Sequence, residues 1–297
     1  MNSIMQSIYV LVSILSATRL TYAAPLEVRS DQTFFFTFGN SYTSTGFDPL
    51  LTQPSATNPM GNPPLGQGTS SGGINWVGYL TTVFNASLVL NYDLAVSGAC
   101  INNSIVKAPV RDLVSQVEST FEPNYAEKPA STPWTAENAV FAFWIGINDI
   151  GHSYQTVDPD TTVPLLLDSY FDLVQQVYEK GARQFLFLTV PPTTKSPLIV
   201  SRGSTDAHAA YVSTYNLELT LRTEIFKETN SDVTVVLYDA WDFMTKVLDN
   251  PQDYGFQNAT CIGEGCVWWN AYHPTSAFHK LMANDMAPKL KAFWSGW

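Results

Sequence analysis

Short apolar runs alternate with longer amphipathic segments along this chain, and that alternation constrains its fold more than any other feature of the sequence. The apolar runs are rich in aromatic and β-branched residues and are apolar at successive positions. Strands that are buried on both faces of a parallel sheet have this composition. The runs predict five strands, at residues 34–38, 88–92, 139–145, 185–190 and 233–238.

The segments between these runs have the apolar spacing of helices. Residues 165–180, for example, place Leu166, Tyr170 and Leu173 on one face and end before Gly181, a common residue after a helix. The predicted helices are 74–84, 110–121, 165–180, 207–229 and 276–293. Alternating strands and helices indicate an α/β fold, which we expect to be a three-layer α/β/α, flavodoxin-like sandwich with a five-stranded parallel sheet.

Residues suited to nucleophilic catalysis follow the predicted strands, where open α/β sheets place their sites. Ser41 follows the first strand, in a stretch that we expect to turn and then enter a helix. Gly98 and Asn148 follow the second and third strands as candidate oxyanion donors, although either alone is equally typical of a turn. His273, before Pro274, is the best placed of the four histidines to act as a general base.

Taken in order, these segments resemble the marker motifs of the SGNH, or GDSL, hydrolases. The block Gly146-Ile147-Asn148-Asp149 matches the third motif of that family, and His273-Pro274 matches the ending of the fifth. Residues 38–43, the approach 144–146 and Trp268-Trp269 are most similar to secreted fungal acetylesterases of carbohydrate esterase family 16.

The resemblance implies a two-step acyl transfer. Ser41 is acylated by an ester and then released by water, while His273 carries the proton. The backbone amides of Ser41 and Gly98, with the Asn148 side chain, hold the oxyanion. No cofactor and no metal ion are implied.

Two positions depart from the family pattern. The first motif usually has Asp before the serine, where this chain has Asn40, a mainly structural position. More consequential is Asn270, three residues before His273, where the family usually carries the aspartate that orients the imidazole. Three interpretations stay open: Asn270 or a backbone carbonyl steers the ring of a Ser–His pair, Asp239 or Asp242 substitutes for the aspartate, or activity is low.

The N-terminal sequence predicts secretion. An apolar stretch at 8–15 precedes Thr21-Tyr22-Ala23, which favours a signal peptide at 1–23 and a single hydrolase domain at 24–297. The alternative is a membrane anchor, for which the apolar run is short. Three sequons, at Asn85, Asn102 and Asn258, agree with an extracellular glycoprotein.

The three cysteines predict one local disulfide. Cys261 and Cys266 are separated by a short segment with two glycines, so they can pair in an oxidising compartment. Cys100 is left as a buried or a reactive thiol. The spacing of Cys and His excludes a typical zinc site.

Residues 49–73, rich in Pro and Gly, form a long connection after Ser41. We interpret it as a wall of the active site, the alternative being a loosely ordered surface loop. Aromatic residues near the motifs could stack on sugar rings or simply pack in the core. They are Trp76, Trp268, Trp269 and Tyr272.

These observations predict a secreted, monomeric serine esterase that acts on acetyl or other short acyl esters, on small molecules or oligosaccharides. Alternatives are a lipase or lysophospholipase for longer acyl chains, with 49–73 covering an acyl groove, and a catalytically weakened sugar-binding relative. A net charge of −11 argues against nucleic acid as a partner, and no segment after the leader is apolar enough to be an integral membrane segment.

Overall fold

A five-stranded parallel sheet forms the centre of the protein, as the sequence predicts. The computed structural model describes residues 32–297. The strands follow the order β2-β1-β3-β4-β5, the flavodoxin-like arrangement, with every neighbouring pair parallel. Their bounds are β1 (Gln32–Gly39), β2 (Leu88–Asp93), β3 (Ala139–Trp144), β4 (Gln184–Leu188) and β5 (Thr234–Tyr238).

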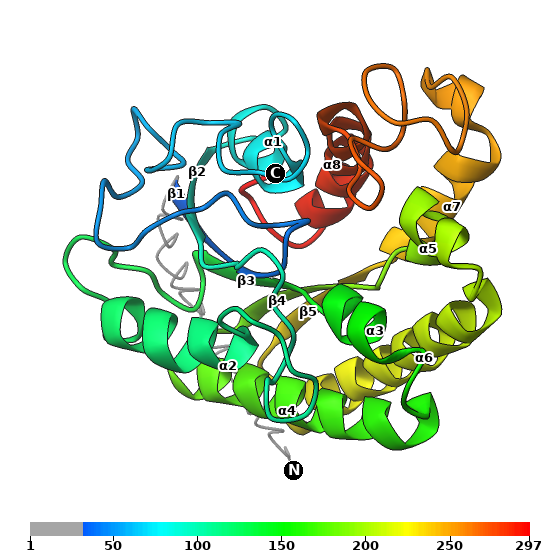
Figure 1. Ribbon diagram of the computed structural model, residues 1–297. Helices are drawn as coiled ribbons and strands as arrows, with labels where there is room; N and C mark the ends of the chain where they lie inside the picture. Colours follow the sequence, from blue (N-terminus) through cyan, green and yellow to red (C-terminus); the bar gives the residue numbers. More distant parts are fainter. Residues whose placement is uncertain (1–31) are drawn as a thin grey trace, which may run out of the picture.

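Helices cover both faces of the sheet (Figure 1). On one face α1 (Trp76–Thr82) packs against α8 (Ser276–Lys291), and on the other α4 (Pro159–Glu179) packs against α6 (Thr205–Thr229). The shorter helices are α2 (Leu113–Gln116), α3 (Ile147–Ser153), α5 (Pro197–Arg202) and α7 (Ala240–Asp249). No helix within residues 32–297 is long and apolar enough to cross a membrane.

The prediction of a single helix over 110–121 is wrong in its bounds and type. Asp112 caps the helix by accepting the Ser115 N–H, so α2 begins at Leu113. After one turn the backbone widens into a π-helix, η1, over Val117–Ala126. The α4 helix begins earlier than predicted, because Asp158 caps it and Pro159 suits a first turn. Helices α3, α5 and α7 were not predicted.

An aromatic core fixes the strands around β1. Phe36 stacks on Phe141 with ring centroids 5.0 Å apart, and Phe38 stacks on Phe143 at 4.5 Å. All four rings are fully buried. Because Gly39 is in register with Trp144 of β3, the carboxyl ends of β1 and β3 finish at the same edge. The loops that follow these strands therefore meet there.

Candidate active site

Ser41 lies in a tight turn at the end of β1. The Asn40 carbonyl accepts the backbone N–H groups of Thr43 and Ser44, at 3.0 and 2.8 Å, and the Asn40 side-chain oxygen accepts that of Tyr42 at 3.0 Å. Asn40 is fully buried, in agreement with a structural role. The expected helix after Ser41 is wrong, because the turn runs into an irregular segment and the next helix begins at Trp76.

Ser41, His273 and Asn270 form a connected chain of side chains. The His273 Nε2 atom lies 2.8 Å from the Ser41 Oγ atom, and the His273 Nδ1 atom lies 3.0 Å from the Asn270 Oδ1 atom. Both distances are within hydrogen-bond range. The structure thus brings together the predicted nucleophile, the predicted base and the residue that replaces the usual aspartate.

The neighbours of Asn270 determine which way its amide points. Its Oδ1 atom accepts the backbone N–H groups of Tyr272 and His273, each at 2.9 Å. Backbone N–H groups only donate, so the atom that faces the His273 ring is the oxygen. The ring must then donate from Nδ1, which leaves the Nε2 lone pair facing the Ser41 hydroxyl. A neutral amide, locked in this turn, therefore selects the imidazole tautomer that can accept a proton from serine.

Burial keeps the imidazole neutral. Desolvation lowers the pKa of His273 to about 4. The Tyr42 ring lies 5.6 Å from the imidazole, and the Tyr42 hydroxyl donates to the Tyr272 carbonyl. The partner of Nδ1 is a neutral amide, so no carboxylate stabilises the protonated ring against its loss of hydration. The neutral ring is therefore available as a base over most of the acidic and neutral pH range.

The three predicted oxyanion donors, Ser41, Gly98 and Asn148, each keep an N–H hydrogen that no protein acceptor uses in the described part of the chain. Within residues 32–297, the backbone N–H groups of Ser41 and Gly98 donate to no protein acceptor. The Asn148 Nδ2 atom donates one hydrogen to the Ala99 carbonyl at 2.8 Å, which fixes the amide and leaves its second hydrogen free. Gly98 has a φ of +85°, which glycine tolerates readily. Asn148 lies in the first turn of α3 rather than in the simple β-turn that was the alternative.

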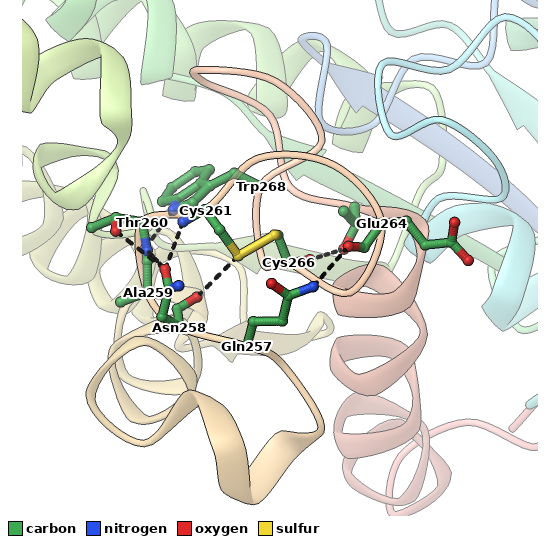
Figure 2. The surroundings of a disulfide bond; sticks show 9 residues. Gln257, Asn258, Ala259, Thr260, Cys261, Glu264, Cys266 and Trp268 are labelled. Carbon is green, nitrogen blue, oxygen red and sulfur yellow. Dashed lines mark hydrogen bonds between the residues drawn. A yellow bond between two sulfur atoms is a disulfide. The ribbon is translucent and has the colours of Figure 1, made fainter.

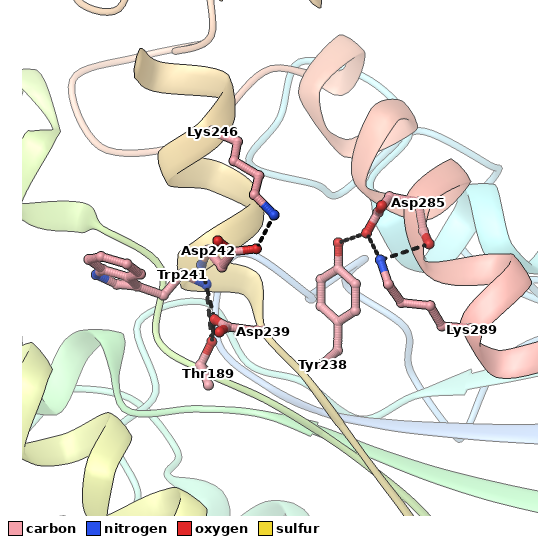
Figure 3. A network of polar contacts seen from close by, with 8 residues as sticks. All are labelled: Thr189, Tyr238, Asp239, Trp241, Asp242, Lys246, Asp285 and Lys289. Atoms are coloured by element: carbon pink, nitrogen blue, oxygen red, sulfur yellow. Dashed lines mark hydrogen bonds and ion pairs between the residues drawn. The ribbon is translucent and has the colours of Figure 1, made fainter. Parts of the chain in front are cut away.

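The substitute carboxylates are engaged elsewhere. Asp239 caps α7 by accepting the Asp242 N–H at 2.9 Å, and it also accepts the Thr189 hydroxyl at 3.1 Å. Asp242 is paired with Lys246 (Figure 3). Neither side chain bonds to His273, so the interpretation that one of them replaces the missing aspartate finds no support in the geometry.

The loop that carries Asn270 and His273 is cross-linked at its base. Cys261 pairs with Cys266, with the two Cα atoms 5.4 Å apart. The buried Trp268 indole donates to the Ala259 carbonyl at 2.9 Å beside this pair (Figure 2). Cys100 is buried and unpaired, and burial raises the pKa of its thiol, which agrees with an inert thiol.

The connection at 49–73 contacts the segment that leads to Gly98 and the loop that carries His273. The Ser70 hydroxyl lies 3.4 Å from that of Ser97, the residue before Gly98. A Cβ atom at Gly72 would lie only 2.5 Å from the Trp269 ring, so the Gly72 backbone lies directly on that ring. These contacts agree with a wall of the site and disagree with a loosely ordered loop.

The aromatic residues separate into two groups. Trp76 and Trp268 are fully buried and belong to the core, and Tyr272 is half-buried. Trp269 keeps 45% of its surface exposed, next to Asn270. Of the four candidates for sugar stacking, Trp269 is the one whose indole remains accessible.

A buried carboxylate that no sequence motif predicts ties two of these segments together. Asp93, the last residue of β2, accepts the backbone N–H groups of Thr45 and Ala95 and the Thr37 hydroxyl. It therefore joins the segment after Ser41 to the one that leads to Gly98. Burial raises its pKa to about 7. The available signal was a charged residue directly after an apolar strand.

The sequons differ in how their amide nitrogens are used. Asn85 and Asn102 donate to Ser87 and Ser169, whereas Asn258 is exposed and uses only its oxygen. The predicted signal peptide at 1–23 and the start of the predicted domain at residue 24 lie outside the described residues.

Comparison with known proteins gives a consistent result. Residues 35–286 match the family model for GDSL-like Lipase/Acylhydrolase. The chain is 40% identical over 267 residues to an acetylesterase of Thermothelomyces thermophilus, which spans 87% of this chain and 88% of that protein. An acetylesterase of Hypocrea jecorina is 27% identical over 196 residues, 62% of this chain and 55% of that protein. A solved GDSL-like lipase of Parabacteroides merdae covers 88% of this chain and 95% of its own, with a TM-score of 0.53 and 15% identity, which supports the fold alone.

Proposed function

Because the chain belongs to the GDSL-like lipase/acylhydrolase family and is a carboxylic ester hydrolase, we propose that it is a serine esterase that removes acetyl or other short acyl groups from carbohydrates. The acyl group passes through a covalent intermediate on Ser41. The similarity to two acetylesterases supports the acetyl group, and the accessible Trp269 beside the site supports a sugar.

The proposed reaction has two matching halves. The His273 Nε2 atom takes the hydroxyl proton of Ser41 as the Oγ atom attacks the ester carbonyl, and the backbone N–H groups of Ser41 and Gly98 with the Asn148 amide stabilise the oxyanion. His273 then returns the proton to the leaving alcohol. Water, deprotonated by His273, attacks the acyl-enzyme and releases the acid and free Ser41.

The single observation that carries this proposal is the 2.8 Å contact between His273 Nε2 and Ser41 Oγ, with the ring tautomer set by Asn270. The test is hydrolysis of a chromogenic acetate by the wild type and by Ser41→Ala. We expect the variant to lose at least about 10⁴-fold in kcat. Equal rates would contradict the proposal. A series from acetate to octanoate decides the acyl length, and a rate that rises along the series would favour the lipase alternative.

The carbohydrate part of the proposal has a separate test. Trp269 is held on one side by Gly72 and through its backbone N–H, which donates to the His273 carbonyl at 2.8 Å. A rigid, exposed indole next to the base gives a sugar ring a flat surface to stack on. We expect Trp269→Ala to raise KM for an acetylated oligosaccharide about tenfold and to leave ethyl acetate hydrolysis unchanged. An equal change for both substrates would remove the support for a sugar.

We also propose that the protein is secreted, after cleavage behind Ala23. The leader-like sequence, the Cys261–Cys266 pair and the exposed Asn258 sequon support this proposal. Sequencing the N-terminus of protein recovered from the medium of a eukaryotic host tests it. Protein that stays in the cell with an intact N-terminus would contradict it.

A further inference from the structure

Gln116 bonds to the backbone of Gly39, and this contact plays no part in the reaction steps proposed above. It is buried, with 1% of its surface exposed, and it is the last residue of α2. Its Oε1 atom accepts the Gly39 N–H at 2.9 Å, and its Nε2 atom donates to the Gly39 carbonyl at 2.8 Å. One side-chain amide thus pairs in both directions with the backbone of the last residue of β1.

Gly39 joins two segments of the candidate site: the nucleophile segment, residues 39–45, and the oxyanion segment, residues 94–103. Its carbonyl accepts the Gln116 amide and also the Val96 N–H at 3.1 Å. Gly39 stands two residues before Ser41, and Val96 stands two residues before Gly98. A larger residue at position 39 would displace the backbone of β1 or β3, because its Cβ atom would lie 2.3 Å from the Trp144 carbonyl oxygen.

The position of Gln116 is itself fixed by the oxyanion segment. The Asp112 carboxylate accepts the Ser115 N–H and the Asn103 N–H, both at 2.9 Å. The Leu113 N–H donates to the Cys100 carbonyl at 3.0 Å. The start of α2 is therefore held by residues that follow Gly98, and the end of α2 holds Gly39, two residues before Ser41.

We propose that Gln116 is a positioning residue that keeps the Ser41 hydroxyl in register with the oxyanion donors for acyl transfer. This proposal rests on the proposed role of Ser41. A movement of Gly39 shifts both the Ser41 side chain and its N–H, since only two peptide units separate them. Misplacement of reacting groups by about 1 Å can cost about 100-fold in rate. The helix widens from α to π directly after Gln116, and such widenings recur at functional sites.

The test compares two variants of Gln116 over a range of pH. Gln116→Met keeps the length of the side chain and removes both hydrogen bonds, so kcat should fall about 10- to 100-fold with little change in KM. In Gln116→Glu, a protonated carboxyl offers one donor and one acceptor, as the amide does, whereas a carboxylate only accepts and repels the Gly39 carbonyl. The ratio of variant to wild-type kcat should therefore rise as the pH falls.

Using that ratio cancels the titrations that both proteins share. The titratable groups on the segments around Gly39 are shared by both proteins: Asp93, which bonds to Ala95 and Thr45, Asp112 at the start of α2, Asp149, which bonds to Ile101, and His273, which bonds to Ser41. Gln184→Met is the control, because it removes an amide–carbonyl bond, to Ala136 at 2.8 Å, at the opposite end of the sheet. Gln184→Met should keep its kcat, and it should lose less stability than Gln116→Met because it removes one part-buried bond rather than two buried ones.

The outcomes separate this proposal from the role of Ser41. A folded Gln116→Met with wild-type kcat, or a Gln116→Glu ratio that does not change with pH, would overturn the positioning role. If Gln116→Met does not fold, the Gln116→Glu ratio decides alone. Ser41→Ala is assayed in parallel. An active Ser41→Ala refutes the nucleophile itself, while an inactive Ser41→Ala beside unaffected Gln116 variants refutes only the role of Gln116.

Discussion

The two sides of the candidate active site are held in place by different means. The sheet side, comprising Ser41, Gly98 and Asn148, lies at the ends of β1, β2 and β3 and is tied by buried side chains such as Asp93. The loop side, comprising Asn270 and His273, lies in a segment before α8, and the His273 ring is oriented by the exposed Asn270 amide three residues earlier.

This difference has a physical consequence. Nucleophile and oxyanion geometry depend on the packed core, so changes there alter stability and rate together. Orientation of the base depends on local hydrogen bonds near solvent, so changes there alter the chemistry without unfolding the core. A neutral Asn270 can orient the His273 ring because the turn fixes the amide oxygen towards that ring, which an isolated amide would not ensure.

The largest effect is expected on the loop side. His273→Ala removes the base and should lower kcat by at least about 10⁴-fold while the free energy of unfolding stays almost unchanged. His152→Ala, at an exposed position of α3, is the matched control and should keep full activity. Chromogenic acetate assays with urea unfolding measure both quantities. A loss below tenfold for His273→Ala would show that another group is the base.

A smaller effect is expected on the sheet side. Asn148→Ala removes one oxyanion donor and should lower kcat by about 10²- to 10³-fold, with KM little changed. It also loses the bond to Ala99, which should cost about 1 kcal/mol of stability. Asn124→Ala, which loses a comparable 2.8 Å bond to the Thr120 carbonyl, is the control for that cost. An equal loss of stability with unchanged kcat would exclude Asn148 from the oxyanion hole.

The pH dependence of the loop side can be changed by one substitution. Asn270→Asp places a carboxylate on Nδ1, which stabilises the imidazolium and raises the pKa of His273 from its value of about 4. Activity requires the neutral ring and is lost as the pH falls through that pKa. The acid limb of kcat/KM should therefore move to higher pH, by about one to three units.

Asp242→Asn is the control for this shift, because Asp242 is paired with Lys246 and does not reach the imidazole. Its acid limb should coincide with that of the wild type. An unmoved limb in Asn270→Asp would mean that the side chain at 270 does not orient His273.

The smallest effect concerns the stability of the sheet side. Asp149 is fully buried, its Oδ1 atom accepts the Ile101 N–H at 3.0 Å, and burial raises its pKa to about 7. The folded state therefore binds the proton more tightly than the unfolded state. Its contribution to stability is complete below about pH 4 and is lost as the pH rises to about 7.

Asp149→Asn removes this titration and keeps the acceptor for Ile101. We expect the decline in free energy of unfolding between pH 5 and pH 8 to become shallower, by at most about 1.4 kcal/mol per pH unit. Asp93 titrates in the same direction and remains, so some decline persists. Urea unfolding at both pH values measures it, and identical slopes in the two proteins would contradict the assignment.

The sequence predicted the sheet side and the loop side unequally. Short apolar strands and the residues after them were readable, because the burial of a parallel sheet imposes its composition on every strand. For that reason the sequence predicts Ser41, Gly98 and Asn148 as site residues. His273 was found through its motif and the following proline, and the structure places it against Ser41.

What the sequence could not supply were contacts between distant segments. Gln116 and Asp93 carry no motif, and their partners, Gly39 and Thr45, lie far away along the chain. The short helices α3 and α5 are not predicted, since periodicity is weak over so few residues. The ten-residue α7 differs, because Phe243, Met244 and Val247 follow the spacing of a helix and could have predicted it. The orientation of the Asn270 amide depends on backbone dihedral angles of a turn, which residue types alone do not determine.

A covalent probe can report whether Ser41 is a nucleophile that His273 activates. The folded protein is treated with a fluorophosphonate, and the labelled peptide is identified by mass spectrometry. We expect one adduct, on Ser41, which forms much more slowly in His273→Ala and is absent in Ser41→Ala. A folded protein that stays unlabelled, or that carries the label on another residue, would contradict it.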